Sequence, residues 1–596
     1  MSFDGTPQTS VSEILKERTI ALPDGLEGAK VSRSGGFLTT TLPGDFGNSD
    51  LVVFIPAYNR QLSDEGKYLG TLPHLVRDLA EAGERESVRV TVLISDDSHE
   101  REAALNEPTL RVALAAVCTV PDIYLVGRHE RVATFEGIAE ECERNLRGHL
   151  SYSGTQPAEA EVAYYLNTMR FLATHHGYGP QRVRGHAMTM GIEQPVMSRD
   201  SDVLLFSVDA SHLIEHTDSG DMKVGFRFVY IDDAKEPSIP VRFDPETPFL
   251  KHAVNMRVGS TLAEIQQEFP KARVYRRVKV AKDEGMRKFL EHPSEPVEFR
   301  VEAMEEHPSL SGDTRLISVM DLVWGAPDVN GHSALLNRII SGKRTLISTA
   351  LPAGTTGLDE GKYPGILIKE TTNPTCIEVA SSRELSHMIP WLVIHPNVAG
   401  KGSLLLQTGA RAEDQLKANN KDPKMMLAYS GSMFYHCRAH EGRLEDAVET
   451  FLSEDIGDMV AAIVRQRCSF LASENRWHFD AESLFTDKKK SGFRSAVIEQ
   501  ELRSRIEYTW SRVENIREVT TREMRRDPPH RIELEKIALE IDNRCTTSFE
   551  EFEERVLDYL VQQARFVESV FTVYPVLMDG FAKARHEGKF HAQKWT

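Results

Sequence analysis

The amino-acid sequence predicts an α/β protein in which helices flank a Rossmann-type, mostly parallel sheet and an α-helical region follows. Three features indicate this fold class. A strand pattern, a helical stripe and a second strand pattern follow one another closely, polar segments come directly after the strands, and helical periodicity dominates the last part of the chain. A strand–helix–strand unit of this kind places its two strands parallel in one sheet.

Composition narrows the class of protein. The chain has 596 residues, with 89 acidic and 71 basic side chains and a net charge of -18, which argues against broad binding to nucleic acid or to an anionic membrane surface. Its six cysteines form no Cys-x-x-Cys pair, which fits a reducing compartment and gives no zinc signature. Because no apolar run approaches the roughly 20 residues of a membrane span and no signal-peptide core is visible, we expect a cytoplasmic protein without a membrane span.

The first elements of the predicted sheet lie between residues 51 and 94. Residues 1–47 are expected to form an N-terminal extension, and a domain of residues 48–405 opens with the apolar strand 51–56. A helical face follows, with Gly83 expected to end that helix, and residues 88–94 form the next strand. The helical face consists of Leu72, Leu75, Val76 and Leu79.

Polar residues follow the predicted strands, where ligands bind in open parallel sheets. Asp96 and Asp97 come after the second strand, and Asp200 and Asp202 precede the apolar run 203–206. Two carboxylates on a short turn offer the hard oxygen ligands that Mg²⁺ or Mn²⁺ prefers, with coordination positions left for phosphate. The alternatives are a surface turn at Asp200 and Asp202 and a turn or helix cap at Asp96 and Asp97.

These segments resemble the opening of the inverting family 2 glycosyltransferases with the GT-A fold. The resemblance rests on the loop Pro56, Ala57, Tyr58 and Asn59 and on the segment 93–98. It implies a GT-A-like sheet, a nucleotide site at the loop 56–59, and a role for Asp97 in holding the uracil of a UDP-sugar. The family also carries an arginine at a helix start, about 16 residues before its Asp-x-Asp motif, and the same spacing from Asp200 leads to Arg184. The alternative for Arg184 is a surface charge.

The sequence departs from the family pattern in two respects. Gly185 occupies a position where the family commonly has asparagine. The interval between Asp97 and Asp200 is about twice the usual length, and we interpret residues 130–176 as a helical insertion. Tyr164, Met169 and their neighbours form a helical stripe there.

The general base of the predicted site has two candidates. The segment from Trp324 to Gly342 resembles a family segment in which an acidic residue deprotonates the acceptor hydroxyl, but His332 stands at that acidic position. His332 could be the base, since an imidazole titrates near the working pH, and Asp328 could take its place. Alternatively the resemblance is accidental and His332 caps a helix.

The resemblance implies a metal-dependent glycosyltransferase that moves a hexosyl or N-acetylhexosaminyl group. The donor would be a nucleotide-diphosphate sugar, first of all a UDP-sugar, and the acceptor a small molecule or glycan. Mn²⁺ or Mg²⁺ at Asp200 and Asp202, with Arg184, would neutralise the leaving diphosphate. The alternatives are a nucleotidyltransferase on the same fold and a non-catalytic binding protein that has lost the base.

Residues 406–596 are expected to form an α-helical C-terminal domain. Apolar residues recur there at helical spacing, for example at Leu502, Ile506 and Val513. These stripes are most simply a helical core, and a homo-oligomer surface is the alternative.

Overall fold

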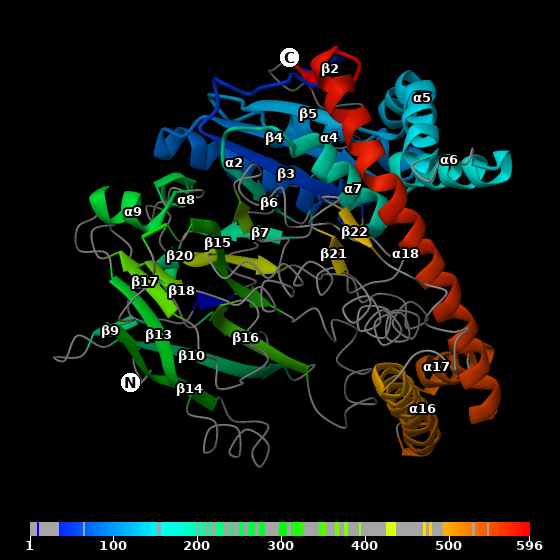
Figure 1. Ribbon diagram of the computed structural model, residues 1–596. Helices are drawn as coiled ribbons and strands as arrows, with labels where there is room; N and C mark the ends of the chain where they lie inside the picture. The colour runs from blue at the N-terminus through cyan, green and yellow to red at the C-terminus, as the bar shows by residue number, and fades with distance from the viewer. Residues whose placement is uncertain are drawn as a thin grey trace.

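The structure is a computed structural model that describes residues 35–199 almost continuously and selected elements of the remainder (Figure 1). The described residues are 9–10, 35–63, 66–151, 157–199, 201, 203–206, 208–209, 214–216, 222–231, 238–239, 242–243, 250–255, 260–268, 273–280, 297–306, 312–313, 315–325, 345–352, 364–368, 375–378, 392–394, 425–436, 469–471, 476–478, 493–526, 531–544 and 548–596.

A mixed sheet organises the part of the chain that contains the predicted site. Its six strands run in the order β2 (Phe37–Thr41), β23 (His591–Trp595), β5 (Asp122–Val126), β4 (Val90–Asp96), β3 (Leu51–Ala57) and β6 (Val196–Ser198). Strands β5, β4, β3 and β6 are parallel, and β23 is antiparallel to both of its neighbours. The general α/β class predicted from the sequence is therefore present.

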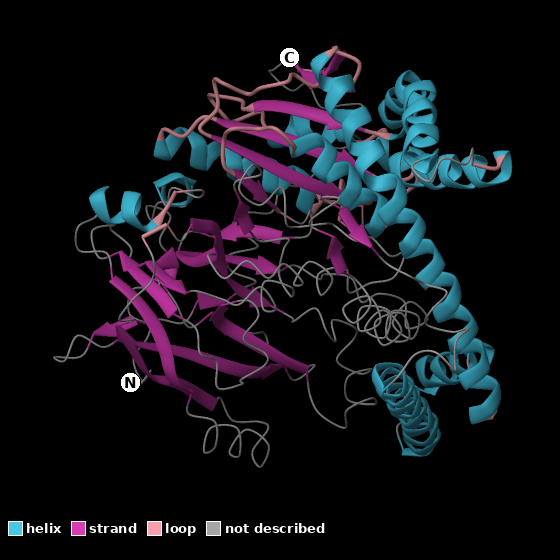
Figure 2. Cartoon of the chain, in the orientation of Figure 1, coloured by secondary structure: helices cyan, strands magenta, loops and turns pink. Residues whose placement is uncertain are grey.

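Helices cover both faces of this sheet, so that the region has three layers (Figure 2). Helices α2 (Thr71–Glu86) and α4 (Asn106–Ala113) pack on one face, and α5 (Arg128–Leu150), α6 (Glu159–Thr174), α7 (Tyr178–Thr189) and α18 (Phe549–His586) pack on the other.

Successive side chains of β3 belong to two different cores, which explains why this strand needs helices on both faces of the sheet. Leu51, Val53 and Ile55 belong to the core under α2, whereas Val52 and Phe54 belong to the core under α5 and α7. Successive side chains of a strand point to opposite faces, so a continuously apolar strand is stable only when both faces are covered.

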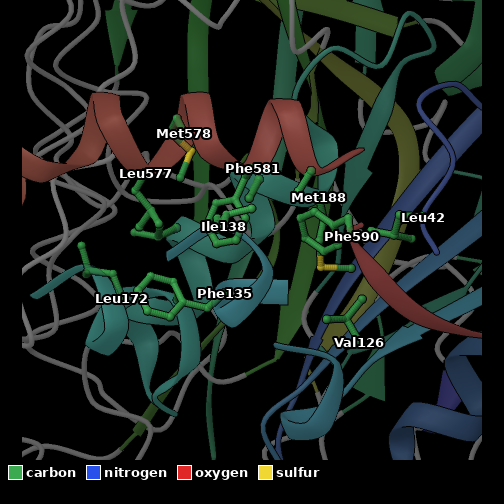
Figure 3. Packing of buried hydrophobic residues seen from close by; sticks show 14 of the residues in the cluster. Leu42, Val126, Phe135, Ile138, Leu172, Met188, Leu577, Met578, Phe581 and Phe590 are labelled. Atoms are coloured by element: carbon green, nitrogen blue, oxygen red, sulfur yellow. The ribbon is translucent and has the colours of Figure 1, made fainter. Parts of the chain in front are cut away.

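The second core joins segments that are far apart in the chain. Phe135 and Ile138 of α5, Leu172 of α6 and Phe581 of α18 lie together in it (Figure 3). Each fully buried side chain of this size stabilises the fold by about 1.5–3 kcal/mol through removal from water. The last turns of α18 are therefore part of the sheet region.

A second group of strands continues from β6, which pairs antiparallel with β19 (Leu392–Ile394). Most of its pairings are antiparallel, and β15 with β20 is parallel. The remaining described elements are β1 (Thr9–Ser10), α3 (Glu100–Ala103), β7 (Val203–Phe206), β8 (Val208–Asp209), β9 (Ile214–His216), β10 (Met222–Ile231), β11 (Ser238–Ile239), β12 (Arg242–Phe243), α8 (Leu250–Asn255), α9 (Leu262–Glu268), β13 (Arg273–Val280), β14 (Val297–Glu306), β15 (Arg315–Gly325), β16 (Thr345–Pro352), β17 (Pro364–Ile368), β18 (Thr375–Glu378), β20 (Met425–His436), β21 (Ser469–Leu471), β22 (Arg476–His478), α16 (Phe493–Arg526) and α17 (Arg531–Arg544).

The structure places strands within both end regions of the chain. The predicted extension 1–47 contains β2, an edge strand of the sheet, and the predicted helical region 406–596 contains β20 and ends in β23. Helical periodicity correctly predicts α16, α17 and α18. It could not indicate β23, whose five residues pair with strands made from a distant part of the sequence. Among the described helices, none combines the length and the apolarity that a membrane crossing needs.

The prediction that Gly83 ends the first helix is wrong. Helix α2 continues to Glu86, and Ser87 follows it in the left-handed conformation with φ 54°. A Cβ atom at Gly83 would lie 2.9 Å from the carbonyl oxygen of Val88. The glycine therefore allows the chain to turn back closely against the helix.

Candidate functional site

The carboxyl ends of three parallel strands meet at one edge of the sheet. Ala57 at the end of β3 is in register with Asp96 at the end of β4, and Ser198 at the end of β6 is in register with Phe54. The next residue, Arg199, donates its backbone N–H to the carbonyl of Phe54 at 2.9 Å. Each strand thus delivers its following segment to the same edge, where ligands bind in open parallel sheets.

Asp97 is the centre of a buried ion cluster at this edge. Arg184 on α7 donates from Nη2 to both carboxylate oxygens, at 2.5 Å to Oδ1 and 2.7 Å to Oδ2. Arg131 on α5 also donates to Oδ1, and the backbone N–H of Gly177 donates to Oδ2 at 3.2 Å. Since an ionised carboxylate offers about four lone-pair positions, Asp97 has its full complement of donors.

The two guanidinium groups have more donors than the cluster has acceptors. Arg184 also donates to the carbonyl of His175 at 2.5 Å, and Arg131 to the carbonyl of Asp96 at 3.0 Å. Both Nε atoms are buried, and neither has a hydrogen-bond partner among the described residues. Burial lowers the pKa of Arg184 to about 9, with the charge of Arg131 acting in the same direction and Asp97 opposing it. The cluster is thus rich in hydrogen-bond donors.

A glycine shapes the backbone that reaches Asp97. Gly177 has φ +117° and immediately precedes α7. A side chain is strained at this φ, so glycine is required for the N–H of this residue to face the carboxylate. The helix that begins here carries Arg184, and one local structure therefore supplies two of the donors on Asp97.

A second network fixes Asp96, the neighbour of Asp97. Its carboxylate accepts from the N–H of Ser98 at 2.9 Å and from Nδ2 of Asn106. Gln61 in turn donates to Oδ1 of Asn106 at 3.0 Å and to Oγ of Ser98 at 3.1 Å. Burial raises the pKa of Asp96, and the hydrogen bonds from Ser98 and Asn106 oppose that rise. The network joins the loops after β3 and β4 to the start of α4.

Two histidines adjoin the Asp97 cluster, since Arg184 donates to the carbonyl of His175. His175 and His176 stack with their ring centroids 5.3 Å apart. Burial lowers the pKa of His175, and the charges of His176, Arg128 and the two buried arginines contribute. This side of the edge therefore disfavours additional positive charge and favours an acceptor-rich group.

The structure brings the predicted nucleotide-binding residues to this one edge. These residues are Pro56, Ala57, Tyr58, Asn59, Asp97 and Arg184. Asp97 and Arg184, which the resemblance pairs only through motif order, are in direct contact. The predicted metal ligands and bases lie outside the described residues; they are Asp200, Asp202, Asp328 and His332.

The described part of the chain does not itself provide a metal site. No group of three or more histidine, cysteine, aspartate or glutamate side chains in it could hold a metal ion. Asp96 and Asp97 already accept hydrogen bonds on both oxygens, and two guanidinium groups lie against Asp97. A divalent cation does not fit there, and the prediction of one depends on Asp200 and Asp202.

Arg131 is the main site residue that the sequence interpretation missed. It lies in the first turn of α5, directly after β5, in a stretch interpreted as an insertion. The signal was present, because residues 123–126 are a short apolar run and a parallel strand there places the following residues at the ligand-binding edge.

Comparisons with models of protein families, with curated proteins and with solved structures find no match. Any functional conclusion for this chain therefore rests on its own residues and on the edge of the sheet where they meet.

Proposed function

We propose that this chain is a metal-dependent glycosyltransferase with a GT-A-like sheet, which binds a nucleotide-diphosphate sugar at the carboxyl edge of β3, β4 and β6. The observation that carries the proposal is the contact of Arg184 Nη2 with both carboxylate oxygens of Asp97, 87 residues apart in sequence. Sequence motifs assign both residues to the nucleotide. Their contact at the ligand-binding edge of a parallel sheet supports that assignment.

The geometry favours a different task for Asp97 from the one that the resemblance implies. Four hydrogen bonds already reach its carboxylate, so accepting the N–H of a uracil would require one of them to be given up. Asp97 therefore serves as a positioning residue that orients Arg131 and Arg184. The positive charge of these two guanidinium groups would then favour the anionic diphosphate of a donor at this edge.

The chemistry of transfer is assigned to residues outside this cluster. A divalent cation held by Asp200 and Asp202 would neutralise charge on the leaving diphosphate. His332 or Asp328 would take the proton of the acceptor hydroxyl, which is a task suited to a group that is deprotonated at the working pH.

Donor binding and donor hydrolysis together test this proposal. A thermal-shift screen of UDP-, GDP- and dTDP-sugars, with and without Mn²⁺, should show stabilisation by one donor class in the presence of the cation. A ligand at a hundred times its Kd stabilises the native state by about 2.7 kcal/mol. The same donor should be hydrolysed slowly without acceptor and faster with one.

A pair of arginine variants makes the test specific to the site. Arg184→Gln should abolish the donor-dependent shift and the hydrolysis, because it removes the charged donors on α7. Arg147→Gln is the matched control, since Arg147 is partly exposed on α5 and pairs with Glu143 and Glu159. A wild-type protein that binds a donor but never hydrolyses or transfers it would be a binding protein. The absence of stabilisation by every donor would contradict the proposal.

A further inference from the structure

Two aromatic rings are exposed at the edge, beside the Asp97 cluster. Tyr58 follows β3 with 46% of its surface exposed, and His99 follows β4 and is also exposed. Their ring centroids are 5.6 Å apart at an interplanar angle of 65°. The two rings therefore form one accessible apolar surface, which we call the Tyr58–His99 ledge.

Hydrogen bonds between the two loops fix the backbone of the ledge. Asn59 has φ +50°, a left-handed conformation that is uncommon for a residue with a side chain. Its N–H donates to Oγ of Ser98 at 2.8 Å, and its side-chain oxygen accepts from the N–H of His99 at 3.1 Å. A strained residue persists where its surroundings determine its conformation, as they do here. The loops thus hold Tyr58 and His99 at a fixed separation.

A hydrogen bond then fixes the orientation of the Tyr58 ring. The hydroxyl of Tyr58 and Nε2 of His99 are 3.1 Å apart. An exposed tyrosine ordinarily samples several rotamers, and ordering it on binding costs affinity. A partner that already holds the hydroxyl reduces this cost.

We infer that His99 is a positioning residue that orients the ring of Tyr58 to stack on the flat face of the donor's nucleobase. The inference rests on the proposed function, which places the donor nucleotide at the edge of the sheet where Tyr58 lies. The inference adds His99, from the loop after β4, to the proposed nucleotide site and gives this residue a physical role. Base affinity depends on His99 through Tyr58, whereas the diphosphate is bound independently of it.

Calorimetry with three probes on the full chain tests the inference. The probes are uridine, UDP and inorganic pyrophosphate, titrated into the wild type, Tyr58→Phe, His99→Phe and the double variant. Tyr58→Phe and His99→Phe each keep a ring and remove the same hydrogen bond. We expect each to weaken uridine and UDP about three- to tenfold, equal to about 0.7–1.4 kcal/mol at 1.4 kcal/mol per tenfold change.

Non-additivity distinguishes positioning from general structural damage. The double variant should bind uridine no more weakly than either single variant, because all three lack one and the same interaction. Pyrophosphate affinity should be unchanged throughout. His99→Gln, which can still hydrogen-bond to the Tyr58 hydroxyl, should restore most of the uridine affinity, and His586→Ala at the exposed end of α18 is the control.

The outcomes separate this inference from the proposed function. Equal uridine affinity in the wild type and His99→Phe would overturn the inference and leave the glycosyltransferase proposal intact. Additive losses, or an equal loss of pyrophosphate affinity, would also overturn it. If the wild type binds no uridine nucleotide, the inference is wrong as stated, and the glycosyltransferase proposal is wrong as well only if GDP- and dTDP-sugars also fail to bind. Because the substituted side chains are exposed, all variants are expected to fold.

Discussion

The two faces of the central sheet are covered in different ways. Helices α2 and α4 cover one face and come from the chain between β3 and β5. The other face is covered by α5, α6 and α7 together with α18, and Lys583 of α18 pairs with Glu141 of α5 across 442 residues of sequence. We call these the local face and the distant face. The comparison teaches that the candidate site depends on the distant face, because Arg131 and Arg184 lie on α5 and α7.

The largest expected effect comes from deleting residues 590–596, which removes β23 from between β2 and β5. The deletion takes away Phe590 and Trp595, and truncating a buried Phe or Trp costs about 3–5 kcal/mol each. That is comparable with the total stability of a typical domain, about 5–15 kcal/mol. We therefore expect loss of cooperative unfolding by circular dichroism. Lys589→Gln, at an exposed position, should change the Tm little.

If the deletion variant still unfolds cooperatively, the difference that we infer between the two faces is wrong. It would mean that the local face alone stabilises the parallel strands and that the distant face is added on. The melting curve of the deletion variant decides between these outcomes.

The second-largest loss of stability is expected from Arg585→Met on α18. The guanidinium of Arg585 donates to the carbonyls of Met188, Met190, Pro43 and Gly44, and so holds the end of α7 to the segment before β3. The contact with Met188 is buried and the other three are partly buried; since a buried carbonyl left without a donor costs about 1–3 kcal/mol, we expect a net loss of about 2–4 kcal/mol. Urea unfolding measures it. A loss no larger than that of Arg147→Met would show that α18 does not hold α7.

A smaller effect should come from Gly580→Ala, where α18 crosses α5. A Cβ atom there would lie 2.8 Å from Sγ of Cys142 and 3.2 Å from Cδ1 of Ile138. Overpacking of this kind costs about 1–3 kcal/mol, which exceeds the gain of about 1 kcal/mol in helix propensity. Gly137→Ala on α5 meets nothing within 4 Å and should stabilise by about 0.5–1 kcal/mol. Equal effects of the two substitutions in thermal unfolding would argue against close packing of α18 on α5.

The last prediction concerns Cys142, whose substitution should change stability least at neutral pH. The reactivity of this thiol reports whether α18 stays packed on α5. Burial raises the pKa of this thiol to about 11, and Glu141 and Asp579 contribute. At pH 8, alkylation of Cys142 by iodoacetamide should be at least about 100-fold slower than that of the exposed Cys118, since the thiolate is the reactive form. Peptide mass spectrometry follows each cysteine. Comparable rates would mean that α18 readily leaves α5.

The same thiol gives a pH dependence with a defined sign. The unfolded thiol loses its proton near the usual value of 9.0, whereas the folded thiol keeps it until about pH 11. Between these values the native state binds more protons than the unfolded state, so the free energy of unfolding falls as the pH rises. Cys142→Ala should remove this contribution to the fall.

The sequence predicts the local face well and the distant face poorly, for a physical reason. Strand β3, helix α2 and strand β4 are neighbours in the chain, and their periodicity is sufficient to predict a parallel unit. The position of β23 depends on pairing with β2 and β5, for which its five residues carry no local signal. Periodicity identifies α18 as a helix, but it does not show that its last turns pack beside α5.

The residues of the candidate site likewise fall into some that the sequence predicts and others that depend on tertiary structure. Motif order predicts that Asp97 and Arg184 belong to one site, and the two residues are in contact. The two further donors on Asp97 come from Arg131 and Gly177, and no motif connects either of them to an aspartate on another strand. The number of hydrogen bonds that a carboxylate has already accepted depends on tertiary structure. The sequence therefore suggests an acceptor role for Asp97 that the geometry does not favour.

The place of β23 in the sheet has a consequence during synthesis of the chain. Gln593 on β23 donates to Glu130 on α5, and the two residues are 463 positions apart. At about 5–20 residues per second, a ribosome needs roughly 25 to 90 seconds to add that length. Throughout this interval the edge of β5 that later pairs with β23 has no partner strand, and such edges recruit strands from other chains. The nascent chain is consequently exposed to aggregation for most of its translation, and its yield should depend on chaperones that bind early and release late.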